Sequence, residues 1–160
     1  MQIRRVRQTE DDAAAIWRII EPIVRAGDTH ALPSGMTRAD ALAYWLAPVH
    51  EVLWPRTRAD WLGPTTCAPT SRAGGAHVAN CGYMTAPWAA GRGVARAMCA
   101  HSLDRARSFR AMQYNLVVST NERAVRLWES FGFETAGRRP GAFLHTGLGL
   151  VDAFVMYRSL

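Results

Sequence analysis

A short stretch in the second half of the chain carries the sharpest chemical signal. Gly91 and Gly93 flank Arg92, Val94 then begins a helix-like segment, and Arg96 follows in its first turn. A glycine turn that leads into a helix presents free backbone N–H groups at the positive end of the helix dipole, where phosphate binds. Glycine allows close approach to the backbone, and arginine adds charge. An ordinary tight turn would carry the same glycines, so both interpretations stay open at this point.

The elements around this turn follow the order of a mixed α/β domain. Apolar patterning predicts strands before and after it, a helix directly behind it, and a helix capped by Asn121 that ends at Gly132. Thr9 and Gly27 bound an N-terminal helix that Pro22 should kink or divide. The remaining predicted elements are strands over 2–7, 77–85, 114–119, 133–138 and 151–157, the start of a strand over 50–53, and helices over 38–46 and from Val94 to about 107.

Length and composition favour one soluble domain spanning residues 1–160. Hydrophobic residues make up 49% of the 160 residues, which excludes a disordered or fibrous chain. The three cysteines have no disulfide or zinc spacing, and residues 1–7 lack the apolar core of a signal peptide. No apolar run is long enough to cross a membrane. We therefore expect a cytoplasmic protein without a metal.

All 19 basic residues are arginines, and the net charge is +6. Arginine binds phosphate well, but a GC-rich coding sequence would also favour arginine and alanine. Nucleic-acid binding is one reading of this charge. However, the arginines are scattered, no basic run reaches five residues, and no aromatic-interleaved binding motif occurs. We therefore expect neither a nucleic-acid partner nor a membrane partner.

Residues 54–75 interrupt the regular pattern. They show no apolar period, contain several prolines, and are long for a structureless stretch in a compact domain. One legal choice of codons for residues 54–71, read from the third letter of each codon, gives Ala-Glu-Asp-Ala-Gly-Arg-Leu-Val-Gly-Thr-Tyr-Tyr-Leu-Arg-Pro-Asn-Gln. That reading is a strand, an acidic-glycine turn and a second strand. We predict that residues 54–72 are out of frame, through an error in the determined sequence or a compensated pair of natural shifts.

Further motifs accompany the glycine turn in the expected order. Ser119 to Glu122, Ala124 to Trp128 and Phe131 to Glu134 follow it. Together these segments resemble the GNAT superfamily of N-acetyltransferases over roughly residues 76–134. The resemblance implies a central twisted mixed sheet, splayed at the cofactor site and flanked by about four helices, which binds acetyl-CoA. Members of this family carry a hairpin where residues 54–72 stand.

The resemblance also implies roles for individual residues. The backbone of Met84 would bind the thioester carbonyl, and Asn121, also an N-cap, would hydrogen-bond the pantetheine arm. The acceptor would lie against the N-terminal helices and their loop, where Trp45 is also a candidate wall. The implied cofactor-binding residues are Met84, Thr85, Gly91, Arg92, Gly93, Val94, Ala95, Arg96, Asn121 and Trp128, and the implied acceptor-binding residues are Trp17, Glu21, Asp28 and Thr29.

The chain departs from the family pattern at Ala90, where Gln or Arg is usual, and at two positions that bear on proton transfer. Trp128 stands where many members have an acidic Tyr, and Asn80 stands where many have a basic Glu. An alkylamine with a pKa near 10.4 must lose a proton before attack, which costs roughly 4.6 kcal/mol at pH 7. His77, Tyr83 and His145 are candidates to take it, although each also suits a structural role.

The function that follows is transfer of an acetyl group from acetyl-CoA to a primary amine of a small molecule or peptide by direct attack. An acetyl-CoA-binding domain without turnover is the first alternative, because the usual Tyr and Glu are missing. An arginine-rich nucleic-acid-binding protein is the second. A homodimer stays open, and the sequence does not identify the amine.

Overall fold

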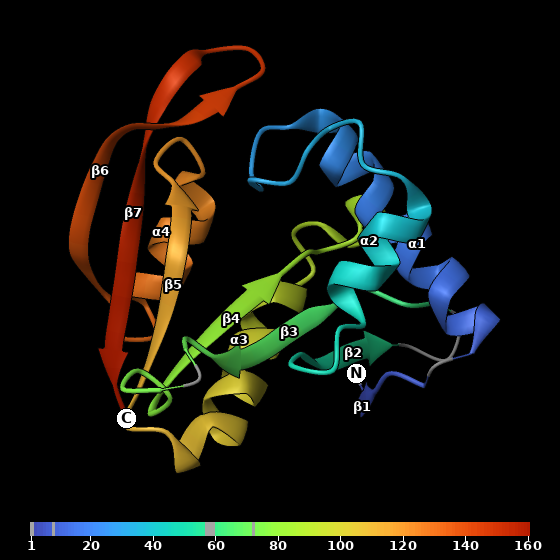
Figure 1. Ribbon diagram of the computed structural model, residues 1–160, viewed down its shortest axis with the longest axis horizontal. Helices are drawn as coiled ribbons and strands as arrows, with labels where there is room; N and C mark the ends of the chain where they lie inside the picture. Colours follow the sequence, from blue (N-terminus) through green and yellow to red (C-terminus); the bar gives the residue numbers. More distant parts are fainter. Residues whose placement is uncertain (1, 8, 57–59, 72) are drawn as a thin grey trace.

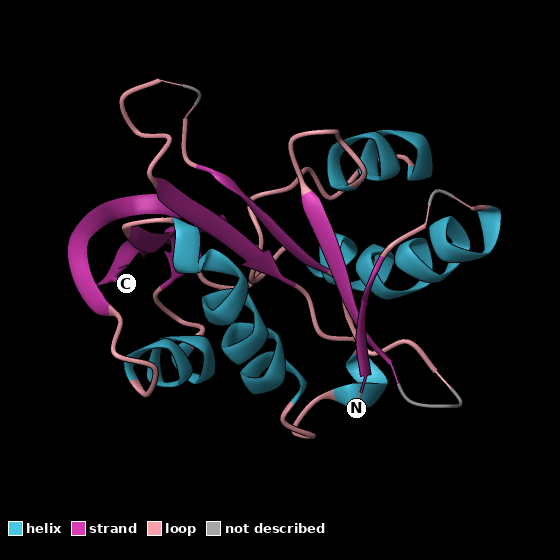
Figure 2. Cartoon of the chain, turned by 90° about the horizontal axis from the view of Figure 1, so that it is seen from below, coloured by secondary structure: helices cyan, strands magenta, loops and turns pink. Residues whose placement is uncertain are grey.

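The computed structural model describes residues 2–7, 9–56, 60–71 and 73–160 (Figure 1). The chain forms one seven-stranded sheet in the order β1-β2-β3-β4-β5-β7-β6, with four α-helices in the described residues. Figure 2 shows α3 and α4 on one face of the sheet and α2 on the other. The elements are β1 (Gln2–Arg5), α1 (Glu10–Ala26), α2 (Arg38–Trp45), β2 (Glu51–Arg56), β3 (Thr65–Pro69), β4 (Val78–Tyr83), η1 (Pro87–Ala89), α3 (Val94–Arg105), η2 (Ala106–Ser108), β5 (Ala111–Val118), α4 (Glu122–Glu129), β6 (Glu134–His145) and β7 (Gly149–Ser159).

Helix α1 keeps its predicted ends but not its predicted break. The Thr9 side chain accepts a hydrogen bond from the Asp12 N–H, and Gly27 ends the helix in a left-handed conformation with φ of 62°. Of the two outcomes expected at Pro22, a kink or a division, the division is wrong, because α1 runs through Pro22 unbroken. Proline removes one backbone hydrogen bond, but the apolar face outweighs that loss. The buried residues of that face are Ile16, Ile19, Ile20 and Val24.

The sheet divides between β4 and β5 into two halves, β1-β2-β3-β4 and β5-β7-β6. These strands are parallel and pair only from Val78 with Ala111 to Asn80 with Gln113. Beyond that point β4 stays paired with β3, whereas β5 stays paired with β7. Figure 1 shows the two strands diverging toward the loop between α1 and α2. The predicted splay of a mixed sheet is therefore confirmed.

The last two strands are longer than the sequence predicts. The pattern gave strands over 133–138 and 151–157, but the pairing of β6 and β7 continues to His145 opposite Gly149. The glycines that suggested a loose link instead lie within the hairpin and at its turn. Gly149 has φ of 71°, a conformation that glycine adopts at little cost and other residues adopt rarely.

Residues 54–75 are not the structureless stretch that their composition predicts. The end of β2 and all of β3 fall in this range, and β3 pairs antiparallel with both β2 and β4. The correction has a physical cause, since the neighbouring strands offer a complete ladder that overrides poor local propensity. One buried polar group is left unsatisfied, because the Thr65 hydroxyl has no hydrogen-bond partner among the described residues.

Two clusters of apolar side chains form the core. One joins α1 and α2 to the start of α3, through residues such as Ile16, Trp45 and Met98. The other lies between the sheet and the helices α3 and α4, and includes Tyr114 and Trp128. Tyr83 packs against both clusters, so the end of β4 is the point where they meet.

Candidate active site

The loop before α3 has the geometry that the glycine spacing predicts. Gly91 and Gly93 have φ of 75° and 74°, and a Cβ at either position would meet nothing within 4 Å. Among the described residues, the backbone N–H groups of Gly91, Gly93 and the first three residues of α3 donate no backbone hydrogen bond. The loop therefore presents a row of free donors at the positive end of α3, with room for an anion.

A cavity of about 590 Å³ opens over this loop. Its walls come from β4, the loop, α3 and α4, and Arg96, Arg123 and Arg126 bring positive charge to it. Arg92, expected to contact the cofactor, does not line it. Arg126 also pairs with Glu122 at 2.9 Å one helical turn earlier. The predicted cofactor residues that line this cavity are Met84, Thr85, Gly91, Gly93, Val94, Ala95, Arg96, Asn121 and Trp128.

The hydrogen bonding just after β4 bears on the oxyanion contact expected for Met84. The Met84 N–H donates to the Pro64 carbonyl at 3.1 Å, so it points toward β3 and is already used. The Ala86 N–H likewise donates to the Leu62 carbonyl in the segment before β3, and N–H groups alternate in direction along an extended chain. The Thr85 N–H lies between these two donors and is therefore directed away from β3. The Thr85 N–H donates no backbone hydrogen bond among the described residues, and Thr85 lines the cavity. The donor available to a carbonyl oxygen is therefore Thr85 rather than Met84.

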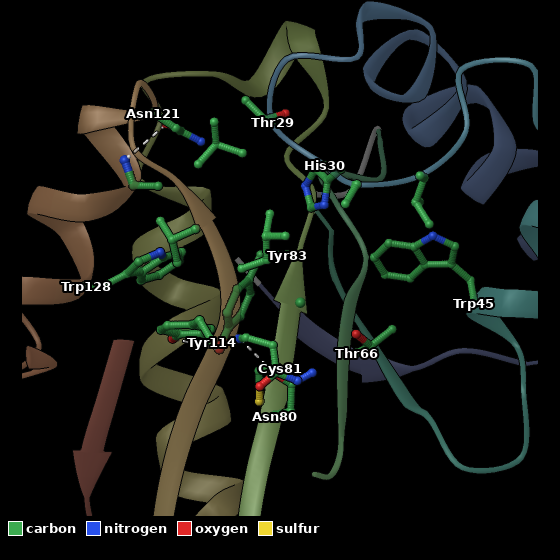
Figure 3. Close-up of a pocket in the computed structure, with 18 of the residues that line it drawn as sticks. Thr29, His30, Trp45, Thr66, Asn80, Cys81, Tyr83, Tyr114, Asn121 and Trp128 are labelled. Carbon is green, nitrogen blue, oxygen red and sulfur yellow. Dashed lines mark hydrogen bonds between the residues drawn. The ribbon is translucent and has the colours of Figure 1, made fainter. Parts of the chain in front are cut away.

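A second cavity of about 300 Å³ lies on the other side of the gap (Figure 3). It extends from the loop after α1 to β3, β4 and β5, with Trp45 of α2 on one wall and Tyr114 and Trp128 on the other. Several residues line both cavities, which therefore adjoin at the end of β4. These shared residues are Thr29, His30, Tyr83, Asn121, Ala124 and Trp128.

His30 lies on the boundary between the cavities, and no sequence pattern singled it out. Burial lowers its pKa to about 4, although a hydrogen bond with the Tyr83 backbone and the charge of Asp28 both act in the opposite direction. The imidazole is therefore neutral at pH 7. Since one ring nitrogen serves the Tyr83 backbone, the other can face a ligand. Its neighbour Thr29 was predicted from the sequence as an acceptor-binding residue. That prediction was the one signal that pointed to this part of the loop.

Three aromatic rings form the floor beneath this boundary. The Trp128 ring centroid lies 5.1 Å from that of Tyr83 and 4.7 Å from that of Tyr114. The two tyrosine hydroxyls are 3.4 Å apart. Burial is the main cause that raises the pKa of Tyr83 and of Tyr114 well above 10, so both are protonated at neutral pH. Tyr83 can thus donate a hydrogen bond but is a weak acid.

Two asparagines have definite structural partners at the site. The Asn121 side chain accepts from the Ala124 N–H at 3.3 Å and caps α4, while the residue also lines both cavities. The Asn80 side chain accepts from the Asn115 N–H at 3.3 Å, just past the last paired residues of β4 and β5. Asn80 therefore bridges the strands where they begin to separate.

Several candidates from the sequence lie elsewhere. His77 is exposed at the opposite end of β4, and His145 lies at the β6–β7 turn, where its Nδ1 accepts from the Gly147 N–H. Trp17 and Glu21 line neither cavity; each contacts Arg25, by ring stacking and by an ion pair. Asp28 acts on His30 only through its charge. Of the four expected acceptor residues, Thr29 alone lines a cavity in the described part of the chain.

Two further kinds of feature are absent from the described residues. No cluster of three or more His, Cys, Asp or Glu side chains is arranged to hold a metal ion there. No helix in that part of the chain has the length and apolarity to cross a membrane.

A mixed sheet that splays between β4 and β5, with a glycine-bearing loop at the start of α3 beside the splay, is the architecture that the sequence resemblance implies. Residues 36–133 match the model of the acetyltransferase (GNAT) family, and the chain belongs to that family. The predicted family, fold and acetyltransferase class are confirmed.

Three similar proteins support this assignment. A GCN5-related N-acetyltransferase from Kribbella flavida is 38% identical, with a TM-score of 0.92 over 99% of this chain and 97% of its own. The N-acetyltransferase aca1 of Schizosaccharomyces pombe is 25% identical over 94% of this chain and 81% of its own. A phosphinothricin acetyltransferase from Sinorhizobium meliloti, solved in complex with AcCoA, shares the fold at 17% identity, with a TM-score of 0.85 over 99% of this chain and 88% of its own.

Proposed function

We propose that this protein transfers the acetyl group of acetyl-CoA to the amine of a small molecule, with the cofactor in the larger cavity and the amine in the smaller one. The observation that carries the proposal is the contact between the cavities at the end of β4. A reaction between two ligands requires their reacting atoms within about 3–3.5 Å. Cavities that share lining residues allow this, whereas a binding domain needs only the first cavity.

The residues of the larger cavity fit acetyl-CoA. Free N–H groups and open glycines before α3 suit a pyrophosphate, and three arginines can pair with its negative charge. When bound, acetyl-CoA supplies an acetyl group activated as a thioester. The Thr85 N–H is placed to stabilise negative charge that develops on the acetyl oxygen during attack. Asn121 is positioned to hydrogen-bond the polar chain of the cofactor.

On the acceptor side, the chain offers orientation rather than strong acid–base groups. The free nitrogen of His30 can accept a hydrogen bond from the incoming amine, and the Tyr83 hydroxyl can donate one. Trp128 stacks on Tyr83 and Tyr114, and its indole N–H has no useful acidity. The role that we assign to Trp128 is to shape the boundary, not to transfer a proton.

A pair of arginine variants tests the cofactor site. Arg123→Ala should weaken acetyl-CoA binding about tenfold in calorimetry, or about 1.4 kcal/mol, because Arg123 lines the cavity. Arg92→Ala removes the same charge from a residue that does not line the cavity, and should change the affinity less than about twofold. Equal losses would contradict this placement. Release of CoA thiol with an amine panel then distinguishes an enzyme from a domain that only binds.

We also propose a cytoplasmic location and a homodimer. Three free cysteines are all buried, which suits a reducing compartment. Leu144, Leu148 and Leu150 are exposed near the β6–β7 turn and supply apolar surface for a second copy. Light scattering of the purified protein gives the oligomeric state, and a monomeric mass would contradict the dimer.

A further inference from the structure

We infer that the acceptor is a small, weakly basic amine that is already unprotonated at neutral pH, of the arylamine, hydrazine or alkoxyamine kind, and not an alkylammonium ion. The inference rests on the proposed function and specifies its acceptor. It is drawn from the chemistry of the smaller cavity and from the absence of charge along its described walls.

No Asp, Glu or Arg among the described residues lines the smaller cavity. Its polar groups are amides and hydroxyls, including those of Asn80, Asn115 and Thr66. The titratable groups that line it come from the loop after α1, from α2, from β4 and from β5. They are His30, Tyr44, Cys81, Tyr83 and Tyr114.

The titratable groups for which a shift is resolved are neutral at pH 7. Burial lowers the pKa of His30 to about 4, which leaves its imidazole uncharged. A hydrogen bond with Cys67 and burial raise the pKa of Cys81 well above its usual value, and burial does the same for Tyr83 and Tyr114. Asp28 lies outside the lining and acts on His30 through its charge, and Arg96, Arg123 and Arg126 line the adjoining larger cavity. The lining therefore supplies no carboxylate to pair with an ammonium ion.

This lining penalises an alkylamine twice. An ammonium ion that enters a site without a counter-charge loses hydration that the site does not replace. In addition, only about one molecule in 2,500 of an amine with a pKa of 10.4 is neutral at pH 7, and no resolved group of the cavity is basic enough to deprotonate the rest. A weakly basic amine avoids both costs because it arrives as the nucleophile.

The size and the walls of the cavity fit the same class. A volume of about 300 Å³ is at the small end for small-molecule sites. Trp45, Tyr83, Tyr114 and Trp128 offer apolar ring surface to a small apolar or aromatic group. Aromatic rings also attract cations, but such a contact would stabilise the protonated form, which cannot attack.

The step balances without a strong base in the protein. The lone pair of the neutral amine nitrogen forms the new N–C bond with the acetyl carbon, and the C–S bond breaks with its electron pair going to sulfur. The nitrogen then loses one proton, which the thiolate sulfur takes directly or through water. The products are the N-acetyl amine and CoA thiol.

The first experiment compares aniline with benzylamine, which is protonated at pH 7. We expect kcat/KM for aniline to exceed that for benzylamine at pH 7 by about tenfold or more. We also expect it to be flat from pH 6 to 9, while the value for benzylamine rises about tenfold per pH unit. A preference for benzylamine at pH 7 would overturn the inference but leave the proposed function intact. Failure with every amine, while acetyl-CoA binds, would overturn both.

A binding measurement without acetyl-CoA isolates the effect of charge. Benzyl alcohol is a neutral analogue of benzylamine, and calorimetry at pH 7 should show it binding about tenfold more tightly or better. Tighter binding of benzylamine would contradict an uncharged site.

A variant then reverses the preference. Asn80→Asp places a carboxylate of the same shape in the wall and keeps an oxygen that can accept from the Asn115 N–H. We expect the benzylamine-to-aniline ratio of kcat/KM to rise about tenfold. Asn80→Ala, which removes the amide without adding charge, should keep the wild-type ratio. An unchanged ratio in folded Asn80→Asp protein would count against the inference.

Discussion

At the scale of single residues, the two glycines before α3 have the backbone conformation that the proposed phosphate-binding loop requires. Both have positive φ, which makes room for an anion and directs N–H groups toward it. Since side chains rarely adopt this conformation, a substitution has two effects: it strains the backbone, and it fills the cavity. A useful test must separate the two.

Gly93→Val should weaken acetyl-CoA binding at least about tenfold, because the new side chain fills the space over the loop. Gly149→Val is the matched control, since Gly149 has φ of 71°, also meets nothing within 4 Å, and lies in the distant β6–β7 hairpin. Calorimetry should show normal affinity for that control. Unchanged binding in folded Gly93→Val protein would refute the phosphate-binding role of the loop.

Trp128 provides a second test at this scale. Trp128→Phe should retain turnover within about fivefold, because an indole has no acidity to lose and a phenyl ring preserves most of the stacking on Tyr83 and Tyr114. The measurement is kcat for thiol release at saturating acetyl-CoA. A fall of about a hundredfold with the cofactor still bound would show that Trp128 takes part in proton transfer.

At the scale of elements, one buried carboxylate fastens β1 to α1. Asp12 in the first turn of α1 pairs with the Arg4 guanidinium at 2.6 Å and accepts from the Arg7 N–H at 2.7 Å. Burial alone would raise the pKa of Asp12, but these partners hold it below 3.8. A lowered pKa in the folded state stabilises the protein above pH 3.8, and that contribution is lost as the pH falls through the lowered pKa.

Asp12→Asn should therefore reduce the free energy of unfolding at pH 7 by about 1–3 kcal/mol. The difference from wild type should shrink below about pH 4, where Asp12 becomes protonated in both states. Urea unfolding at several pH values measures this. Asp11→Asn, at an exposed position in the same turn, is the control and should change little. A difference that does not change with pH would exclude the charge as its cause.

The β2–β3 region tests whether residues 54–72 are in frame. The shifted reading places Tyr at position 65 and Leu at position 66, where the printed chain has two buried threonines, one with an unpartnered hydroxyl. A tryptic digest of the natural protein should then contain a peptide that begins Leu-Val-Gly-Thr-Tyr-Tyr-Leu-Arg-Pro-Asn-Gln, since trypsin does not cleave an Arg–Pro bond. Detection of the printed peptide from residue 59 to residue 72 would exclude an error in the sequence, leaving only a natural pair of shifts.

At the scale of the whole molecule, the site lies where the two halves of the sheet are joined least. Among the described residues, the only direct ladder between the halves is the short pairing of β4 with β5. The larger cavity has walls from both halves, with α3 and β4 on one side and α4 on the other. A cofactor bound there would tie the two halves together.

Acetyl-CoA at a hundred times its Kd should therefore raise the free energy of unfolding by about 2.7 kcal/mol, and Tm by about 5–10 °C for a chain of this size. Differential scanning fluorimetry over a concentration series measures the shift. The Gly93→Val protein should need a higher concentration for the same shift. An unchanged Tm in the wild-type protein would contradict cofactor binding at this place.

The sequence by itself determined what depends on neighbours along the chain. Thr9 and Asn121 cap helices where their local patterns predict, and Gly91 and Gly93 form the predicted loop, because caps and turns are set within a few residues. The order of the motifs was also enough to identify the family. The strand at β3 escaped prediction because neighbouring strands impose it.

Only the tertiary structure decided what depends on residues far apart in the chain. It brought His30 to Tyr83, placed Arg123 rather than Arg92 at the larger cavity, and showed that the Met84 N–H already donates to the Pro64 carbonyl. It also left the smaller cavity without a carboxylate among the described residues that line it. Glu21 and Asp28 do not line it, although they lie close in sequence to Thr29, which does. Packing and strand alternation fix which way each group points, and both are set by partners that a local pattern does not contain.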